Sequence, residues 1–246
     1  MNEFLKATAK SLTSSGFRHS LKIQHERIMG AIAKRQNIGQ NSYLDPSVQV
    51  LGWKNVKIGQ NSVVSEDTWI NVNHRKPETF SLIIGNHCFI GRRNFFTSGN
   101  HIKIGDYCLT GIDCKFLGSG HVYHSPFVPY ITSGTTEDGA IEIGANCWLG
   151  ADVTILKGVK IGYGSIIGAA TVVKQDVPPL SIVVGNPGRI IKRFDMQLQA
   201  WINVTDYPVN GDQFLLAESE YLEVLNKTTF NMRHLRIASS QRFGDL

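Results

Sequence analysis

The sequence predicts a mainly β solenoid in which short parallel strands alternate with tight turns. An aliphatic residue returns every six positions, a glycine commonly follows it, and a small residue stands four positions after it. A period of six fits neither the 3.6-residue period of an amphipathic helix nor the two-residue alternation of a hairpin sheet. Repeats of short fixed length are typical of solenoids, whose coils bury their faces against neighbouring coils. The aliphatic positions of the C-terminal run are Ile143, Leu149, Ile155, Ile161, Ile167 and Val173.

The N-terminal segment, residues 1–37, precedes the hexads and combines helix formers with an excess of basic side chains. We expect a helix that covers the open end of the solenoid. A basic amphipathic segment also suits an anionic membrane surface, so a membrane contact stays open as an alternative. The segment lacks the apolar run of a secretory signal, and no stretch of the sequence is apolar for the length of a bilayer span. We therefore expect a cytoplasmic protein.

The hexads run from Ile38 to Val173 and, at three hexads per coil, predict about six or seven coils. The aliphatic residue of each hexad is expected to point inward, and the glycine to stand where a Cβ atom is costly. The small residue is expected to face inward too, and all four cysteines occupy its position. Burial therefore explains them, and their spacing lacks the CxxC pairs of zinc or redox sites. They are Cys88, Cys108, Cys114 and Cys147.

One segment, residues 118–140, interrupts the hexads. Insertions into solenoids form loops on one face, which often bind ligands. This insertion contains the sequence His-Val-Tyr-His from His121 to His124. We expect it to be an active-site loop. The remaining histidines are interpreted as surface or packing residues, and they are His19, His25, His74, His87, His101 and His234.

The pattern changes again after Val173. The double proline Pro178-Pro179 is expected to end the solenoid, because a strand or helix does not continue through it. We place the β-helical domain at residues 38–194 and a partly helical extension at residues 195–246, with helix formers over 218–226. The extension caps the solenoid, stabilises an oligomer or contacts a substrate, and the sequence does not choose among these roles.

The run from Ile143 to Lys192 contains Trp148 and the motif Gly-Asn-Pro-Gly-Arg that ends at Arg189. It resembles the C-terminal half of the galactoside, maltose and polysaccharide O-acetyltransferases, which are hexapeptide-repeat acyltransferases. Those enzymes place a Gly-His pair in a small loop before the run, as Gly120-His121 stands here. The resemblance covers residues 84–194. It implies a left-handed parallel β-helix, acetyl-CoA as co-substrate and no metal ion; the left hand departs from the usual preference of parallel strand crossovers.

The resemblance also implies roles for residues near the reacting atoms. His121 would be the general base that takes the proton of the acceptor, since an imidazole titrates near working pH. His124 is the rival for that role. Trp148 would wall the acyl pocket, and the backbone N–H of Ala151 would polarise the thioester oxygen. Some relatives carry a serine at the position of Ala151, and this chain lacks that hydroxyl.

Further residues match the positions that hold coenzyme A in the family. Ala169 would hydrogen-bond the pantetheine through its backbone, and Lys174 would reach the pantetheine or the pyrophosphate. Arg189 and Lys192 would reach the adenosine phosphates, to which cationic side chains form charge-assisted bonds. The family assembles as homotrimers, so we expect His121 of one chain to face a coenzyme groove shared with the next.

The acceptor is not fixed by the resemblance, because the Asn and Asp that bind sugar in relatives map to Gly91 and Gly99. We expect O-acetylation of a sugar hydroxyl, in a cell-surface glycan or its precursor, as part of polysaccharide biosynthesis. N-acetylation of an amino sugar and acetylation of an antibiotic are the closest alternatives. A γ-carbonic-anhydrase-like zinc enzyme using His87, His121 and His124, and a non-catalytic scaffold, are more distant ones. No basic stripe interleaved with aromatic residues points to nucleic acid.

Overall fold

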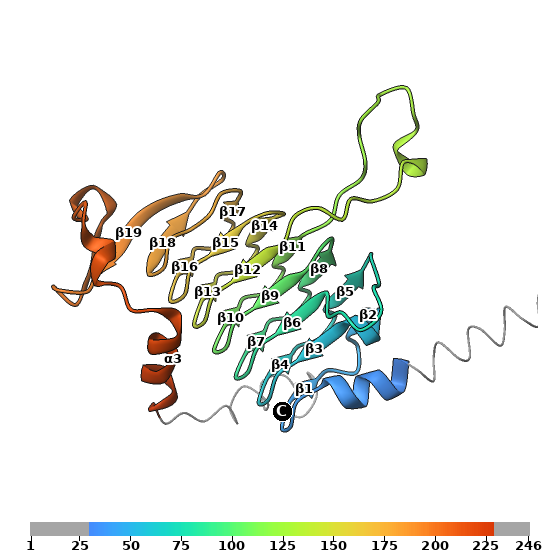
Figure 1. The fold of residues 1–246 in the computed structure, drawn as a ribbon, viewed down its shortest axis with the longest axis horizontal. Helices are drawn as coiled ribbons and strands as arrows, with labels where there is room; N and C mark the ends of the chain where they lie inside the picture. The colour runs from blue at the N-terminus through green and yellow to red at the C-terminus, as the bar shows by residue number, and fades with distance from the viewer. Residues whose placement is uncertain (1–29, 229–246) are drawn as a thin grey trace, which may run out of the picture.

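The computed structural model describes residues 30–228, which form a parallel β-helix with a long projecting loop and a C-terminal extension (Figure 1). Each coil contributes one strand to each of three sheets. Sheet A holds β3 (Val56–Ile58), β6 (Leu82–Ile84), β9 (Ile102–Ile104), β12 (Ile141–Ile143) and β15 (Lys160–Ile161). Sheet C holds β2 (Gln49–Leu51), β5 (Trp69–Val72), β8 (Phe95–Ser98), β11 (Lys115–Leu117), β14 (Thr154–Leu156) and β17 (Val172–Val173).

Sheet B is the longest, and it continues past the last full coil. Its parallel strands are β1 (Tyr43–Leu44), β4 (Val63–Val64), β7 (Phe89–Ile90), β10 (Leu109–Thr110), β13 (Trp148–Leu149), β16 (Ile166–Ile167) and β18 (Ser181–Val184). Two antiparallel strands, β19 (Arg189–Asp195) and β20 (Ala200–Asn203), follow. The chain runs from sheet A to B to C in every coil, so the prism has three edges, which we call the A–B, B–C and C–A corners.

The aliphatic residue of each hexad points into the prism, as the sequence predicted. Ile104, Ile143 and Leu149 are among the many that are almost completely buried. Strand register stacks each on its counterpart one coil away, and Phe96 and Phe116 stack with ring centroids 4.3 Å apart. The core is therefore a set of aliphatic and aromatic columns parallel to the solenoid axis.

The small residue of the hexad also faces inward, and it has a second purpose that the sequence did not reveal. At the A–B corner its hydroxyl or thiol donates a hydrogen bond to a carbonyl of the next coil. The donor–acceptor distances are 2.8 Å from Ser62 to Gly85, 3.1 Å from Cys88 to Gly105, 3.2 Å from Cys108 to Gly144 and 3.3 Å from Cys147 to Gly162. All four cysteines are buried free thiols, which confirms their predicted structural position.

Glycine follows the aliphatic residue because neighbouring coils touch at the corners. A Cβ atom added at Gly105 would lie 2.7 Å from the backbone N of Ala145 and the carbonyl carbon of Gly144. Both contacts are with backbone, which cannot rotate away. The hexad glycine is therefore a packing requirement.

Two segments leave the solenoid, where the sequence predicted one. Residues 118–140 form the long loop between β11 and β12 that projects from the C–A corner (Figure 1). The second excursion, residues 73–81, joins β5 to β6 at the same corner. The buried Asn55 holds it by donating from Nδ2 to the carbonyls of Lys76 (2.6 Å) and Thr79 (2.7 Å). The segment does interrupt the hexads, since the next aliphatic position after Ile70 is Ile84, fourteen residues later, and the prediction overlooked this gap.

The double proline does not end the solenoid, which corrects the prediction. Pro178 and Pro179 take the two corner positions after Val177, and the hexad then continues with the buried Ser181 and Val183. β18 therefore adds one more parallel strand to sheet B. One coil earlier the corner residue Gly162 donates its N–H to the Val177 carbonyl (2.8 Å), but within the described residues no further coil lies beyond Pro178 to accept such a bond, so proline fits here.

The ends of the described chain are partly helical. Residues 30–37 are helical, and residues 1–29 of the expected N-terminal cap lie outside the described residues. α3 (Glu218–Asn226) packs against the A–B corner, with residues 229–246 again outside the description. Between residues 30 and 228, no helix has the length and apolar character needed to cross a bilayer. The short 3-10 turns are η1 (Trp53–Asn55), η2 (Tyr130–Thr132), η3 (Val204–Asp206) and η4 (Gly211–Phe214).

Candidate active site

His121 lies at the paired base of the projecting loop. It forms an antiparallel bridge with Thr135 on the returning limb. On either side of this bridge, the Thr136 N–H donates to the Gly120 carbonyl (2.7 Å), and the Val122 N–H donates to the Gly134 carbonyl (3.1 Å). The backbone at His121 is therefore held in a short ladder, unlike the tip of the loop.

A histidine from the second excursion braces this ladder. The Nε2 atom of His74 lies 3.1 Å from the hydroxyl of Thr135 and 3.2 Å from the carbonyl of Thr136. Its Nδ1 atom lies 3.2 Å from a carboxylate oxygen of Glu137, whose other oxygen pairs with Lys76 at 2.8 Å. The Lys76 ammonium holds the pKa of the Glu137 carboxyl below its ordinary value. The sequence predicted His74 only as a surface or packing residue, because no pattern links residue 74 to residues 135–137.

Both candidate bases are exposed. Within residues 30–228, no hydrogen bond or ion pair engages the imidazole of His121 or of His124. His124 lies beyond the paired base, toward a tip that carries Phe127 (94% exposed) and Ile131 (87% exposed). Fixed backbone and an open imidazole at His121 are the features that a general base needs.

The residues expected near the thioester lie on sheet B and the B–C corner. Trp148 projects outward from β13 and is half exposed (50%). Ala151 and Ala169 occupy the same corner position in successive coils, and the Ala170 N–H donates to the Ala151 carbonyl at 2.8 Å. The structure therefore brings Trp148, Ala151 and Ala169 onto one edge of the prism.

The backbone N–H groups of Ala151 and Ala169 are open. Among the described residues, neither donates a hydrogen bond. At the A–B corner three of the equivalent N–H groups are capped by side chains: Gln60 by Asn86 (2.8 Å), Asn86 by Asp106 (2.8 Å) and Ala145 by Glu218 (2.7 Å). Within the described residues, those of Asp106 and Tyr163 at the same corner have no such cap. Two uncapped donors one coil apart form a ready site for polar groups of an elongated ligand.

The basic residues expected to hold coenzyme A do not gather at one corner of the prism. Arg189 begins β19 beside Gly188, whose N–H donates to the Val172 carbonyl (2.8 Å), so it lies near the B–C corner. Lys192 pairs with Ile182 in sheet B. Lys174 follows β17 toward the C–A corner and is therefore separated from Arg189 by the width of sheet C.

Within one chain, sheet C also separates the base from the open amides. His121 follows the end of β11, whereas Ala151 precedes the start of β14. A three-residue strand spans roughly 10 Å, before the corners are added. A single copy therefore does not bring His121 to the Ala151 N–H.

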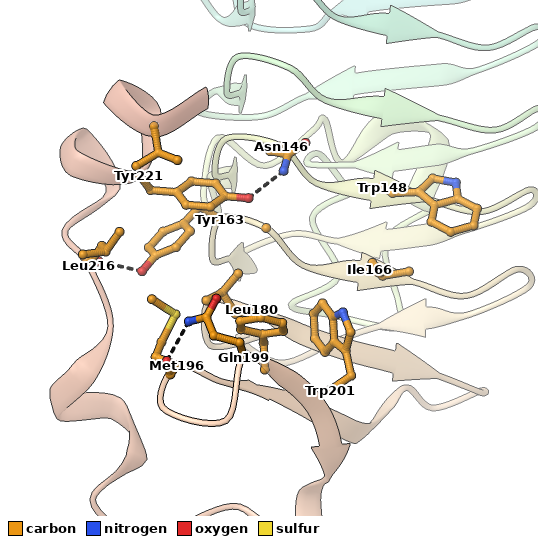
Figure 2. A pocket seen from close by; sticks show the side chains of 13 residues that line it. Asn146, Trp148, Tyr163, Ile166, Leu180, Met196, Gln199, Trp201, Leu216 and Tyr221 are labelled. Atoms are coloured by element: carbon orange, nitrogen blue, oxygen red, sulfur yellow. Dashed lines mark hydrogen bonds between the residues drawn. The ribbon is translucent and has the colours of Figure 1, made fainter. Parts of the chain in front are cut away.

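A cavity of about 450 Å³ opens beside Trp148, between sheet B and the C-terminal extension (Figure 2). Trp148, Ile166 and Trp201 lie along one side, and Tyr163 and Tyr221 lie toward α3. Sequence analysis did not single out Tyr163, Trp201 or Tyr221. The hexad pattern says nothing of the extension, so only its recurring aromatic residues could have pointed to this cavity.

The histidines of the zinc alternative do not meet within one chain. His87 lies at the A–B corner, where its ring stacks on Tyr107 at 5.0 Å. The loop with His121 and His124 leaves from the C–A corner. Over residues 30–228, no three His, Cys, Asp or Glu side chains cluster as a metal site would require.

The sequence is similar to known proteins that contain transferase hexapeptide repeats. The bacterial transferase hexapeptide family (six repeats) matches residues 140–175. A Staphylococcus aureus protein named as an acetyltransferase is 37% identical over 118 residues, which are 47% of this chain and 56% of that protein. The Escherichia coli galactoside O-acetyltransferase is 32% identical over 141 residues, which are 54% of this chain and 64% of that enzyme. The match with the first of these relatives spans little more than half of that protein's length.

A solved structure extends the comparison to the fold. It is AntD, an N-acyltransferase from Bacillus cereus in complex with dTDP and 3-hydroxybutyryl-CoA, with a TM-score of 0.56 and 18% identity. The likeness covers 79% of this chain and 95% of that one. The predicted left-handed β-helix and the relationship to hexapeptide-repeat acyltransferases are thereby confirmed.

Proposed function

We propose that this hexapeptide-repeat protein is an acetyl-CoA-dependent acetyltransferase that transfers the acetyl group directly to a sugar hydroxyl. The observation that carries the proposal is the pair of open N–H donors at Ala151 and Ala169, within the segment that matches the transferase repeat. The relatives named as acetyltransferases, and the coenzyme A thioester bound in AntD, support acetyl-CoA as the co-substrate. No role for a metal ion is proposed.

The chemistry divides between two regions. The imidazole of His121 takes the proton of the acceptor hydroxyl as the oxygen attacks the thioester carbonyl. The Ala151 N–H donates to the carbonyl oxygen, which becomes an oxyanion. The carbon–sulfur bond then breaks, and the sulfur leaves with the proton that His121 had taken. His124 is the second candidate for the base.

Binding of coenzyme A follows the B–C corner. The Ala169 N–H holds the pantetheine one coil beyond Ala151, and Arg189 near the same corner meets the phosphates together with Lys192. Lys174, on the far edge of sheet C, reaches the coenzyme only when a neighbouring copy presents that edge. The site is therefore assigned to the groove between two copies.

A homotrimer supplies such a groove three times, because a closed ring joins two different surface patches of each copy. The outward side chains support this assembly. On sheet B the ladder of outward residues is apolar, and it exposes Leu109 (40%) as well as Trp148. On sheet A the outward ladder is largely charged, with Lys57, Lys103, Glu142 and Lys160. Exposed apolar ladders are typical of surfaces that meet a partner.

The acceptor proposed is a hydroxyl-bearing sugar of a cell-surface glycan or its precursor, met in the cytoplasm. The name of the Escherichia coli relative supports a sugar, while AntD is an N-acyltransferase. Hydroxyl and amine acceptors must therefore be compared directly.

The test is release of free coenzyme A from acetyl-CoA with matched panels of neutral sugars, amino sugars and nucleotide sugars. We expect acceptor-dependent release with hydroxyl sugars, and a loss of about a hundredfold in His121→Ala. His101→Ala is the matched control, since His101 pairs with Glu142 on sheet A, outside the loop (3.4 Å). Full activity in His121→Ala would move the base to His124. Full activity of a sedimenting monomer would contradict the shared groove.

A further inference from the structure

The cavity beside Trp148 lies between the hexapeptide repeat and this chain's own C-terminal extension. β19, the turn before β20, β20 and α3 form its outer wall, and β13 and β16 of sheet B form its floor (Figure 2). Its volume of about 450 Å³ falls within the range of small-ligand pockets. The chemistry of the lining indicates which class of ligand could enter it.

The lining carries no charged side chain among the described residues. Aromatic and aliphatic groups dominate it, including Trp148, Phe194 and Trp201. Burial raises the pKa of the phenols of Tyr163 and Tyr221, so both stay neutral at ordinary pH. Phosphates, carboxylates and ammonium groups would lose hydration here without a partner.

Three polar side chains of the lining, Asn146, Tyr163 and Gln199, already donate hydrogen bonds within the cavity wall. Asn146 donates from Nδ2 to the Tyr221 hydroxyl (2.6 Å), and the Tyr163 hydroxyl donates to the Leu216 carbonyl (2.5 Å). Gln199 donates from Nε2 to the Met196 carbonyl (2.6 Å). A saccharide would have to compete for these groups, because its hydroxyls need hydrogen-bond partners. A hydrocarbon makes no such demand.

The cavity also lies in line with the proposed thioester site. The chain runs from Asn146 at the A–B corner, through β13 with Trp148, to Ala151 at the B–C corner. A thioester whose oxygen meets the Ala151 N–H would have its acyl group near Trp148, three residues earlier in the chain, and Trp148 lines the cavity (Figure 2). A longer acyl chain would continue from Trp148 toward Tyr163 and Trp201.

We infer that this cavity is an acyl-chain site, so that the protein accepts unbranched acyl-CoA thioesters longer than acetyl-CoA. The inference rests on the proposed function, because it takes the thioester position from Ala151 and Trp148. It extends that function from acetyl transfer to transfer of longer saturated acyl groups. The C-terminal extension is then a determinant of donor specificity.

The experiment measures the affinity of the full chain for acetyl-, butyryl-, hexanoyl- and octanoyl-CoA by isothermal titration calorimetry. Each methylene that enters the cavity is expected to tighten binding about fourfold, until the cavity is filled. Val224→Trp places an indole into the cavity from α3 and is expected to abolish the dependence on chain length. Ile166→Trp fills the cavity from the floor and gives a second, independent test.

Glu223→Trp is the matched control, because Glu223 is the exposed neighbour of Val224 on α3 and does not line the cavity. It should keep the chain-length dependence of the wild type. Equal or falling affinity from acetyl- to octanoyl-CoA in the wild type would overturn the inference and leave acetyl transfer standing. An unchanged dependence in both plugged variants would also overturn it. Failure to bind any thioester would contradict the proposed function itself.

Discussion

The A–B and B–C corners are built from the same hexad, yet they differ in how often a side chain caps the backbone. At the A–B corner side chains cap the backbone N–H groups of Gln60, Asn86 and Ala145, but not those of Asp106 and Tyr163 within the described chain. At the B–C corner the equivalent groups of Ala151 and Ala169 have no partner in the described chain. The inner packing of the two corners is alike, since each buries glycines against the next coil. The proposed function therefore relies on outward polar groups that folding does not use.

The first coil shows that folding does not need these donors. Pro46 occupies the position in its coil that Ala151 and Ala169 occupy in theirs, following Leu44 as Ala151 follows Leu149. Proline has no N–H group, so this corner forms without it. Proline at position 151 would therefore remove the N–H group proposed to act in catalysis, and Pro46 shows that the fold accepts proline at this position of a coil.

The largest predicted effect is that of Ala151→Pro on acetyl transfer. We expect turnover to fall by about a hundredfold or more, because removal of one oxyanion donor has that effect in other acyl-transfer sites. Stability should be nearly unchanged, by the example of Pro46. The measurements are steady-state turnover and urea unfolding.

Ala151→Gly is the control for that substitution, because it keeps the N–H group and shortens only the side chain. It should retain most of the turnover. Wild-type turnover in Ala151→Pro would show that the open N–H group has no catalytic part, and the contrast between the corners would lose its functional meaning.

The regular part of the fold could be read from the sequence because each hexad repeats one local solution. Inward Ile, turning Gly and a small residue must recur wherever coils stack, so the columns at Ile104 and Cys108 were predictable. Pro178 and Pro179 misled the prediction, since they stand at the last corner next to sheet A, where the described chain has no further coil to accept a backbone hydrogen bond. Proline was taken as a break in the chain, although it occupies an edge position that tolerates it.

The candidate site was predictable only where the family resemblance covers it. Ala151, Ala169 and His121 were assigned from the resemblance of residues 84–194 to the hexapeptide-repeat acyltransferases, which supplies positions that the hexad alone does not. The brace from His74 to Thr135 depends on a contact between residues 61 apart in the chain. Trp201 reaches the cavity through an extension with no repeat. Contacts of that kind arise from tertiary packing and leave no periodic signal in the sequence.

The second predicted effect concerns the buried thiols that both corners contain. Burial raises the pKa of the Cys114 thiol at the B–C corner to about 11, and burial raises that of Cys108 at the A–B corner well above its usual range. An unfolded thiol ionises near pH 9.0, so the unfolded chain loses its proton first. Stability is therefore complete below pH 9 and falls as the pH rises toward 11, by about 2–3 kcal/mol for Cys114.

Urea unfolding at pH 8 and at pH 10.5 measures this loss. Cys114→Ser should be less sensitive to alkali than the wild type, because serine keeps the donor and does not ionise in this range. Serine already holds the equivalent small position at Ser62 and Ser165. If the wild type and Cys114→Ser lose the same free energy of unfolding between pH 8 and pH 10.5, ionisation of the Cys114 thiol does not contribute to the alkaline destabilisation.

The smallest predicted effect is that of Glu218→Ala, which uncaps the Ala145 N–H at the A–B corner. The Glu218 carboxylate accepts that bond at 2.7 Å from the first turn of α3. An exposed charge-assisted bond of this kind contributes about 1 kcal/mol, so the unfolding midpoint should fall slightly. Glu223→Ala, an exposed change on the same helix, controls for loss of charge. Equal stability of the two variants would mean that the cap on Ala145 adds nothing to folding, and that this N–H group is like the uncapped ones of Asp106 and Tyr163 at the same corner in the described chain. Capping would then be incidental, and the open donors at Ala151 and Ala169 would need another reason to mark the site.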